Sequence, residues 1–192
     1  MSNTKKMLIE VARTLFAARG KKDVTMNDIA EASKKGRRTL YTYFTNKEDI
    51  YKAVIDKELN TILDRLTIVS NQKTEPDVKL TNHILTHLDA VKDVVNRNGS
   101  LRADFFHDIY EVERKRKKID IQEISLIRSI ISEGIEKNIF KRMDIELSSI
   151  IIFYAIKGLE VPYIRQNISS VFDKNKNSIV EFVFMGIKKK PF

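Results

Sequence analysis

Apolar residues recur at steps of three and four positions along nearly the whole chain. The first such segment places Leu8, Val11, Ala12, Leu15 and Phe16 on one face, as an amphipathic helix requires. The 192 residues include only three prolines and six glycines, so few positions can interrupt a helix. The pattern therefore predicts an all-α fold. No apolar run approaches the roughly 20 residues that a membrane-spanning helix needs.

Breaks in this pattern divide the chain into a series of helices. We expect helices at about 4–19, 26–33, 36–44, 77–96, 144–162 and 178–189, and a longer one from a cap at Thr45 or Asn46 to about Ser70. Residues 101–137 are also expected to be helical. Their polar stretch 111–120 contains no breaker, so the pattern leaves open whether they form one helix or two. The polar segment 169–177 is expected to be irregular.

Two short helices near the N-terminus are joined by a tight turn. Thr25 and Asp28 have the spacing of a capping box, in which each side chain accepts a hydrogen bond from the other residue's backbone amide. Val24 and Ile29 stand where a hydrophobic staple closes the start of a helix. A basic helix follows the turn at residues 34–36. This arrangement is typical of a helix-turn-helix.

The second of these helices is expected to expose a basic and aromatic face. Leu40 and Phe44 lie four residues apart and share the buried side, whereas Arg37, Arg38 and Tyr41 fall on the other side. The first fifty residues contain eleven Lys and Arg against six Asp and Glu, which is +5 of the chain's net charge of +9. Such a concentration of positive charge favours phosphate binding. We interpret this segment as a DNA-binding domain.

Individual side chains of the basic helix have different expected roles. Arginine carries paired donors that match the major-groove edge of guanine, so Arg37 and Arg38 are the candidates for base recognition. Thr39 and Tyr41 can offer hydroxyls to bases or contact a thymine methyl group. The residues best placed for phosphate contacts are Thr42, Tyr43 and Lys47.

Residues 8–54 resemble the DNA-binding domain of the TetR family of bacterial transcriptional regulators. The resemblance rests on the runs ARTLFAARG, VTMNDIAEAS, RRTLYTYF and NKEDIY. The positions that it implies for DNA contact are Thr25, Arg37, Arg38, Thr39, Tyr41, Tyr43 and Lys47.

The turn departs from the family pattern. Lys34 replaces the usual turn glycine, and Gly36 replaces the usual hydroxyl cap. Lys34 is therefore expected to adopt a left-handed conformation at some energetic cost. Lys34 and Lys35 are expected to add phosphate contacts.

The rest of the chain resembles the family in layout only. The resemblance implies a DNA-binding domain at residues 1–48 and a helical effector-binding and dimerisation domain at residues 49–192. It implies a repressor that needs no cofactor, binds a palindromic operator in double-stranded DNA as a homodimer, and is released by a small-molecule effector. Dimerisation is expected through the last two helices, at about 144–162 and 178–189. These helices are apolar around more of their circumference than a surface helix needs, which fits either a central core helix or a dimer interface.

An effector pocket is expected near the richest aromatic stretch of the second domain. The candidate effector-binding residues are His83, His87, Phe105, Phe106 and Tyr110. His83 and His87 have the four-residue spacing that can hold a metal ion, but no third ligand is identifiable, so no metal is expected. The alternatives are that the aromatic residues pack in the core and that the histidines are ordinary partly buried or surface residues.

Other classes of function have less support in the sequence. The chain has no cysteine, no glycine-rich phosphate loop and no serine nucleophile motif, so we do not expect an enzyme. The lack of cysteine and of a visible signal peptide suits a cytoplasmic protein. A membrane-surface module would use Lys188–Lys190, although a dimer core explains the preceding apolar helix better. A small-molecule sensor or helical interaction protein that has lost DNA control is the main alternative.

Overall fold

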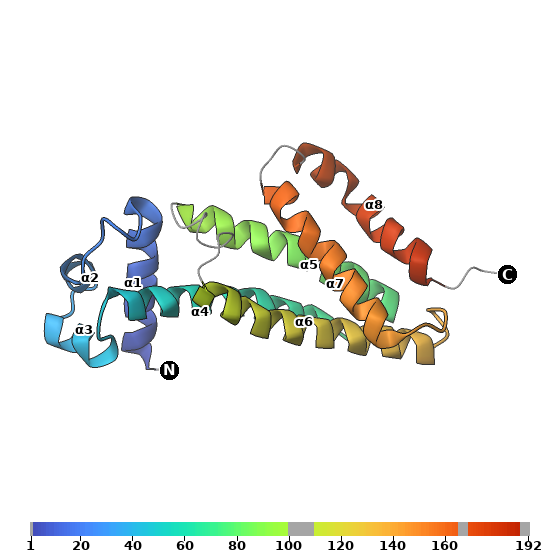
Figure 1. The fold of residues 1–192 in the computed structure, drawn as a ribbon, viewed down its shortest axis with the longest axis horizontal. Helices are drawn as coiled ribbons and strands as arrows, with labels where there is room; N and C mark the ends of the chain where they lie inside the picture. The colour runs from blue at the N-terminus through green and yellow to red at the C-terminus, as the bar shows by residue number, and fades with distance from the viewer. Residues whose placement is uncertain (1, 100–109, 165–168, 189–192) are drawn as a thin grey trace. The chain divides into compact units, whose positions relative to one another are not determined.

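The computed structural model describes residues 2–99, 110–164 and 169–188, and within these ranges the chain is helical almost throughout (Figure 1). The described helices are α1 (Asn3–Arg19), α2 (Met26–Ala32), α3 (Arg37–Tyr43), α4 (Lys47–Ser70), α5 (Pro76–Arg97), α6 (Tyr110–Glu136), α7 (Ile145–Ile164) and α8 (Ser169–Ile187). The only extended pairing in these ranges is an isolated antiparallel bridge between Phe140 and Lys188. The predicted all-α fold is confirmed. No helix in the described part of the chain has the length and apolar character to cross a membrane.

The chain forms two compact units. Unit 1 comprises residues 1–60 and 93–116, and unit 2 comprises residues 61–92 and 117–192. Helices α4, α5 and α6 each contribute one part to unit 1 and the other part to unit 2. The domain boundary after residue 48 stays a prediction.

Local sequence signals set the ends of the helices in unit 1. The Ser2 hydroxyl accepts a hydrogen bond from the Lys5 amide at 3.2 Å, and α1 stops at Gly20, whose φ is 82°. The capping box of Thr25 and Asp28 is formed at the start of α2. The buried apolar side chains of this unit are Leu8, Ile9, Ala12, Phe16, Val24, Ile29, Ala30, Leu40, Phe44, Ile50, Tyr51, Val54, Ile55, Leu59, Val94 and Val95.

Unit 2 has its own apolar core. Helix α7 begins after Asp144, whose carboxylate accepts a hydrogen bond from the Leu147 amide at 2.9 Å. Helix α6 ends near Asn138, whose φ is 58°, and the Phe140 amide then donates to the Gly134 carbonyl at 3.0 Å. The core residues are Leu80, Ile84, Leu88, Ile127, Ile130, Ile131, Phe140, Ile152, Phe153, Ile156, Val180 and Ile187.

The structure corrects the prediction for the last helix. Helix α8 begins at Ser169, so an irregular segment 169–177 followed by a helix from 178 was wrong. The segment is polar, but it contains neither proline nor glycine, and adding turns to a helix that has already formed is much easier than starting one. The polar stretch 111–120 lies inside α6. The predicted helix start at residues 101–109 lies outside the described residues.

Replacing Gly134 by alanine is expected to destabilise the protein by about 1–3 kcal/mol. A methyl group at this position would collide with the ring of buried Phe140, which lies directly against Gly134. Urea unfolding followed by circular dichroism measures the change. In a Phe140→Leu background the cost of Gly134→Ala should shrink, because the collision involves the ring. An equal cost in both backgrounds would contradict this explanation.

Candidate nucleic-acid interface

Helix α3 is held in unit 1 by its inner side. Leu40 is buried within the helix, and Phe44 is buried directly after it. Helix α2, which contacts α3, contributes buried Ile29 and Ala30. A helix of seven residues is too short to be stable alone in water, so this burial decides whether α3 forms. The ammonium group of Lys5 lies 5.4 Å from the centre of the Phe44 ring, which adds a cation–π contact.

Six of the side chains that were predicted to contact DNA lie on α3. The exposed ones are Arg37, Arg38, Tyr41 and Thr42, and the partly buried ones are Thr39 and Tyr43. The Thr42 hydroxyl already donates a hydrogen bond to the Arg38 carbonyl at 2.9 Å. Tyr41 has 51% of its surface exposed, so its ring and hydroxyl are accessible to a partner. The contacts of these residues with DNA stay predictions.

The turn between α2 and α3 has the strained conformation that its sequence predicts. Lys34 has a φ of 52°, in the left-handed region that glycine occupies at lower cost. Gly36 is the N-cap of α3 and offers the helix no side-chain hydrogen bond. Lys34 and Lys35 are exposed and immediately precede the exposed Arg37 at the start of α3. The turn and the start of α3 therefore present positive charge together.

An open hollow beside this turn includes two residues that the sequence pattern did not single out. The hollow is lined by Asn27, Ala30, Glu31, Lys34, Lys35 and Arg37. Asn27 and Glu31 are exposed and lie one turn apart on α2. Their amide and carboxylate groups are of the kinds that recognise base edges. The four-residue spacing on the polar side of α2 was the signal that could have identified them.

Two other predicted DNA contacts, Thr25 and Lys47, have partners within unit 1. The Thr25 hydroxyl accepts the Asp28 amide at 3.2 Å and donates to the Asp28 carboxylate at 2.8 Å. Hydrogen bonds from the Thr25 amide and hydroxyl hold the pKa of Asp28 below its usual value. The Lys47 ammonium donates to the carbonyls of Lys21 and Lys22 at 2.8 Å and 3.2 Å. Lys47 therefore ties the segment after α1 to the start of α4.

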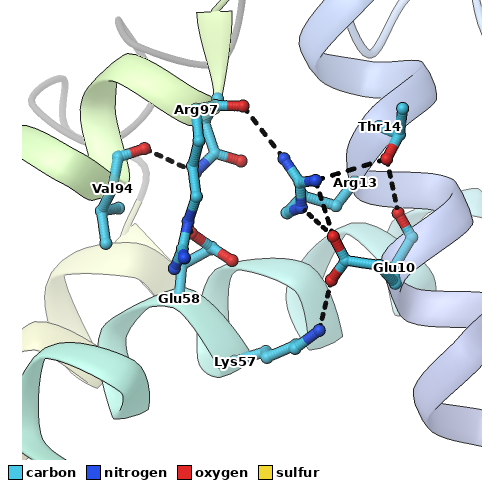
Figure 2. A network of polar contacts seen from close by, with 8 residues as sticks. Glu10, Arg13, Thr14, Lys57, Glu58, Val94 and Arg97 are labelled. Carbon is cyan, nitrogen blue, oxygen red and sulfur yellow. Dashed lines mark hydrogen bonds and ion pairs between the residues drawn. The ribbon is translucent and has the colours of Figure 1, made fainter.

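The end of α5 is bound inside unit 1 by a cluster of polar contacts (Figure 2). The Glu58 carboxylate on α4 is buried and accepts hydrogen bonds from the Arg97 guanidinium at 2.6 Å and the Asn98 amide at 2.8 Å. The Arg97 carbonyl accepts a hydrogen bond from the Arg13 guanidinium at 2.9 Å, which connects the cluster to α1. Glu10 pairs with Arg13 and with Lys57 beside it. These contacts join α1, α4 and the end of α5.

The two histidines that were candidates for effector binding lie in a buried chain of polar side chains in unit 2. Ser70 Oγ is 2.9 Å from His83 Nδ1, and His83 Nε2 is 3.2 Å from Glu123 Oε1. The same Glu123 oxygen is 2.7 Å from His87 Nδ1, and His87 Nε2 is 3.0 Å from Glu160 Oε1. All five residues are buried. We call Ser70, His83, Glu123, His87 and Glu160 the buried relay.

Charges within the buried relay stabilise one another. Burial by itself would lower the pKa of His87, but the charge and hydrogen bonds of Glu123 and Glu160 outweigh it and raise this pKa to about 10. Burial would likewise raise the pKa of Glu123, but attraction to His87 and bonds from both histidines hold it at about 2. His87 is therefore an imidazolium whose two N–H groups donate to carboxylates on α6 and α7.

The geometry of the buried relay does not resemble a metal site. The two ring nitrogens of His87 are bonded to two different carboxylates, so the donor atoms do not converge on one point. Among the described residues, no three His, Cys, Asp or Glu side chains are grouped in a way that could hold a metal ion. Of the other effector candidates, Phe105, Phe106 and the side chain of Tyr110 lie outside the described residues.

A capped short helix, a tight turn and an exposed basic helix anchored from behind together define a DNA-binding helix-turn-helix. Comparison with known proteins supports the assignment of a helix-turn-helix. The family described as bacterial regulatory proteins, tetR family, matches residues 8–54. Residues 8–54 therefore match the DNA-binding domain of TetR-family transcriptional regulators.

Similar proteins extend well beyond the helix-turn-helix. The chain is 26% identical over 152 residues to the uncharacterized HTH-type transcriptional regulator YhgD of Bacillus subtilis, covering 77% of each chain. It is 22% identical over 184 residues to the fatty acid metabolism regulator protein of the same organism, covering 95% of each chain. A crystal structure of a transcriptional regulator from Cytophaga hutchinsonii has the same fold, with a TM-score of 0.80, 22% identity, and 96% and 98% of the two chains covered.

Raising the pH from 6.5 towards 10 is expected to reduce the free energy of unfolding. Folded His87, with a pKa of about 10, keeps a proton that the unfolded histidine, with its ordinary pKa of 6.5, has released. The stabilisation is therefore complete below pH 6.5 and is lost as the pH rises through 10, with a slope of at most about 1.4 kcal/mol per pH unit. Urea unfolding at a series of pH values measures this slope.

His87→Gln is the control for that measurement. It removes the titrating group, so its free energy of unfolding should fall less steeply with pH over the same interval. It should also be less stable at pH 6.5, by about 3–5 kcal/mol, because the buried carboxylates lose their cationic partner. Parallel pH curves for the two proteins would show that His87 does not hold the proton.

Proposed function

We propose that the protein is a repressor that binds a palindromic operator as a homodimer and is released by a small-molecule effector held in the domain at residues 49–192. It would act in the cytoplasm, where bacterial DNA lies. The observation that carries the proposal is the exposed basic face of α3, supported on its inner side by the burial of Leu40 and Phe44. This geometry allows a short helix to enter a major groove while its supporting residues stay in the core.

Base recognition is assigned to the first turn of α3. Arg37 and Arg38 are exposed, and each guanidinium can donate two parallel hydrogen bonds to a guanine edge. Tyr41 lies one turn further along the same face and can contact a thymine methyl group or a phosphate. Lys34 and Lys35 precede this turn and are assigned to the phosphate backbone.

Exposed apolar side chains on α7 and α8 support dimerisation through these two helices. Leu147, Ile151 and Tyr154 recur at four- and three-residue steps on α7, and Phe182 and Met185 follow the same spacing on α8. Between 56% and 80% of the surface of each residue is exposed. Monomeric proteins rarely leave such a set of large apolar residues in water, and a second copy of the same chain would cover it.

The effector site is assigned to the domain at residues 49–192. The histidines His83 and His87 are buried and bonded within the relay, so they are available to an effector only if it displaces one of their present partners. Phe105, Phe106 and Tyr110 are the aromatic candidates for binding the effector. The effector would act by preferring one of two separations of the α3 helices over the other.

Arg37→Ala and Arg38→Ala are expected to relax the sequence that the protein selects from a random DNA pool. Each substitution should weaken binding to the preferred operator by about 1–3 kcal/mol. The specificity should relax at the one base position that the arginine contacts. Selection followed by sequencing measures the change, and fluorescence anisotropy on the chosen duplex measures the affinity.

Lys35→Ala is the matched control for these arginine variants. A phosphate contact carries no sequence information, so this variant should weaken binding to all duplexes alike and reduce the slope of log affinity against log salt by about 1. If the arginine variants behaved like Lys35→Ala, the assignment of base recognition would be wrong. Wild-type binding that was equally strong on scrambled DNA would favour a sensor without DNA control.

Ile151→Glu combined with Phe182→Glu is expected to convert a homodimer into a monomer. Burying two carboxylates in an apolar interface is costly, because the charges lose their hydration. Analytical ultracentrifugation at several concentrations measures the mass. Ile121→Glu, at an exposed apolar position on α6, is the control and should leave the dimer intact. A wild-type protein that sediments as a monomer would rule out this part of the proposal.

A further inference from the structure

We propose that the buried relay positions the end of α4 and thereby sets the half-site spacing that the dimer accepts on DNA. This inference rests on the proposed function above. Ser70 is the last residue of α4, and its hydroxyl bonds to His83 on α5 at 2.9 Å. From His83 the relay continues through Glu123 on α6 to His87, and from His87 to Glu160 on α7. One unbroken series of hydrogen bonds therefore joins four helices within unit 2.

Helix α4 gives this series a route to the DNA-binding helices. It is continuous from Lys47 to Ser70, with residues 47–60 belonging to unit 1 and residues 61–70 to unit 2. Unit 1 contains α3, and the Lys47 ammonium ties the first residue of α4 to the segment after α1. Ser70 is therefore one end of α4. The other end, Lys47, is bonded within unit 1, which contains α3.

A second buried contact bonds α4 to the end of α5. Glu58 lies on α4 in unit 1, where it accepts hydrogen bonds from Arg97 and Asn98 at the end of α5. Twelve residues separate Glu58 from Ser70, which corresponds to roughly 18 Å along a helix. Helices α4 and α5 are thus bonded to each other by buried polar groups at two places, once in each unit.

Packing alone does not explain why the relay is polar. The apolar core residues of unit 2 include Leu80, Ile84 and Leu88, which share α5 with the two histidines. Apolar side chains of similar volume in place of a buried ion pair are often as stabilising or more so, because charges lose their hydration on burial. Apolar packing tolerates small shifts, whereas directional hydrogen bonds select one arrangement. Fixing an arrangement is the best-attested use of buried polar groups.

The far end of the relay links it to the proposed dimer. Glu160 lies on α7, the helix that carries the exposed Leu147, Ile151 and Tyr154. If α7 meets its partner copy, the relay connects the dimer interface to the end of α4 in each protomer. Two-fold partners need their recognition helices about 34–36 Å apart to occupy successive major grooves. Loosening the relay should therefore affect the required spacing more than the affinity of one protomer for one half-site.

The test uses the full-length protein and the operator that the wild type selects from random DNA. Duplexes are prepared with the selected half-site spacing, with one base pair removed, with one base pair added, and with a single half-site. Fluorescence anisotropy at one salt concentration measures each affinity for Ser70→Ala, His87→Gln, Ser70→Thr and Ile127→Val. Ser70→Thr keeps the hydroxyl, and Ile127→Val trims the same core outside the relay. Thermal unfolding is measured for every variant.

Ser70→Ala and His87→Gln are expected to reduce the discrimination between correct and incorrect spacing by about 2- to 30-fold. Their affinity for the single half-site should stay within about twofold of wild type, Ser70→Thr should keep wild-type discrimination, and Ile127→Val should lower only the unfolding temperature. If the relay variants also changed only the unfolding temperature, the inference would be overturned. If His87→Gln does not fold, the spacing discrimination of Ser70→Ala alone tests the inference. A wild type that selects no DNA sequence would overturn the proposed function instead.

Discussion

The burial of Leu40 and Phe44 is the interaction on which the DNA-binding surface depends. Helix α3 has seven residues, and a helix of that length does not persist in water on its own. Its N-cap is Gly36, which supplies no side-chain hydrogen bond, and the preceding Lys34 is in a left-handed conformation. Local preferences therefore support α3 weakly. Its position relies on the apolar contacts behind it, and these leave the opposite face free to carry the arginines.

Polar contacts in the interior have a different role from this apolar core. Glu58 binds the end of α5 in unit 1, and the buried relay binds the end of α4 in unit 2. In each case a buried carboxylate accepts hydrogen bonds from more than one residue. Apolar contacts supply most of the stability, and these directional bonds select one arrangement of the helices that the two units share.

Most of the fold and part of the DNA-binding site could be predicted from the sequence, because their signals are local. The capping box of Thr25 and Asp28, the helix stop at Gly20 and the left-handed Lys34 all depend on neighbours within a few residues. The start of α8 was predicted wrongly at residue 178. Its first turns are polar and give no periodic signal, yet they extend a helix that the apolar residues after them stabilise.

The sequence by itself determined the helical architecture, the helix-turn-helix and the basic face of α3, since spacing and caps act along the chain. Only the tertiary structure decided the partners of the polar residues. Lys47 was predicted to contact phosphate, and its ammonium bonds to carbonyls about twenty-five positions earlier in the chain. His83 and His87 were considered as effector ligands, and their partner Glu123 follows them by 40 and 36 positions. No local pattern encodes such pairings, because folding brings the groups together and burial then gives their charges energetic weight.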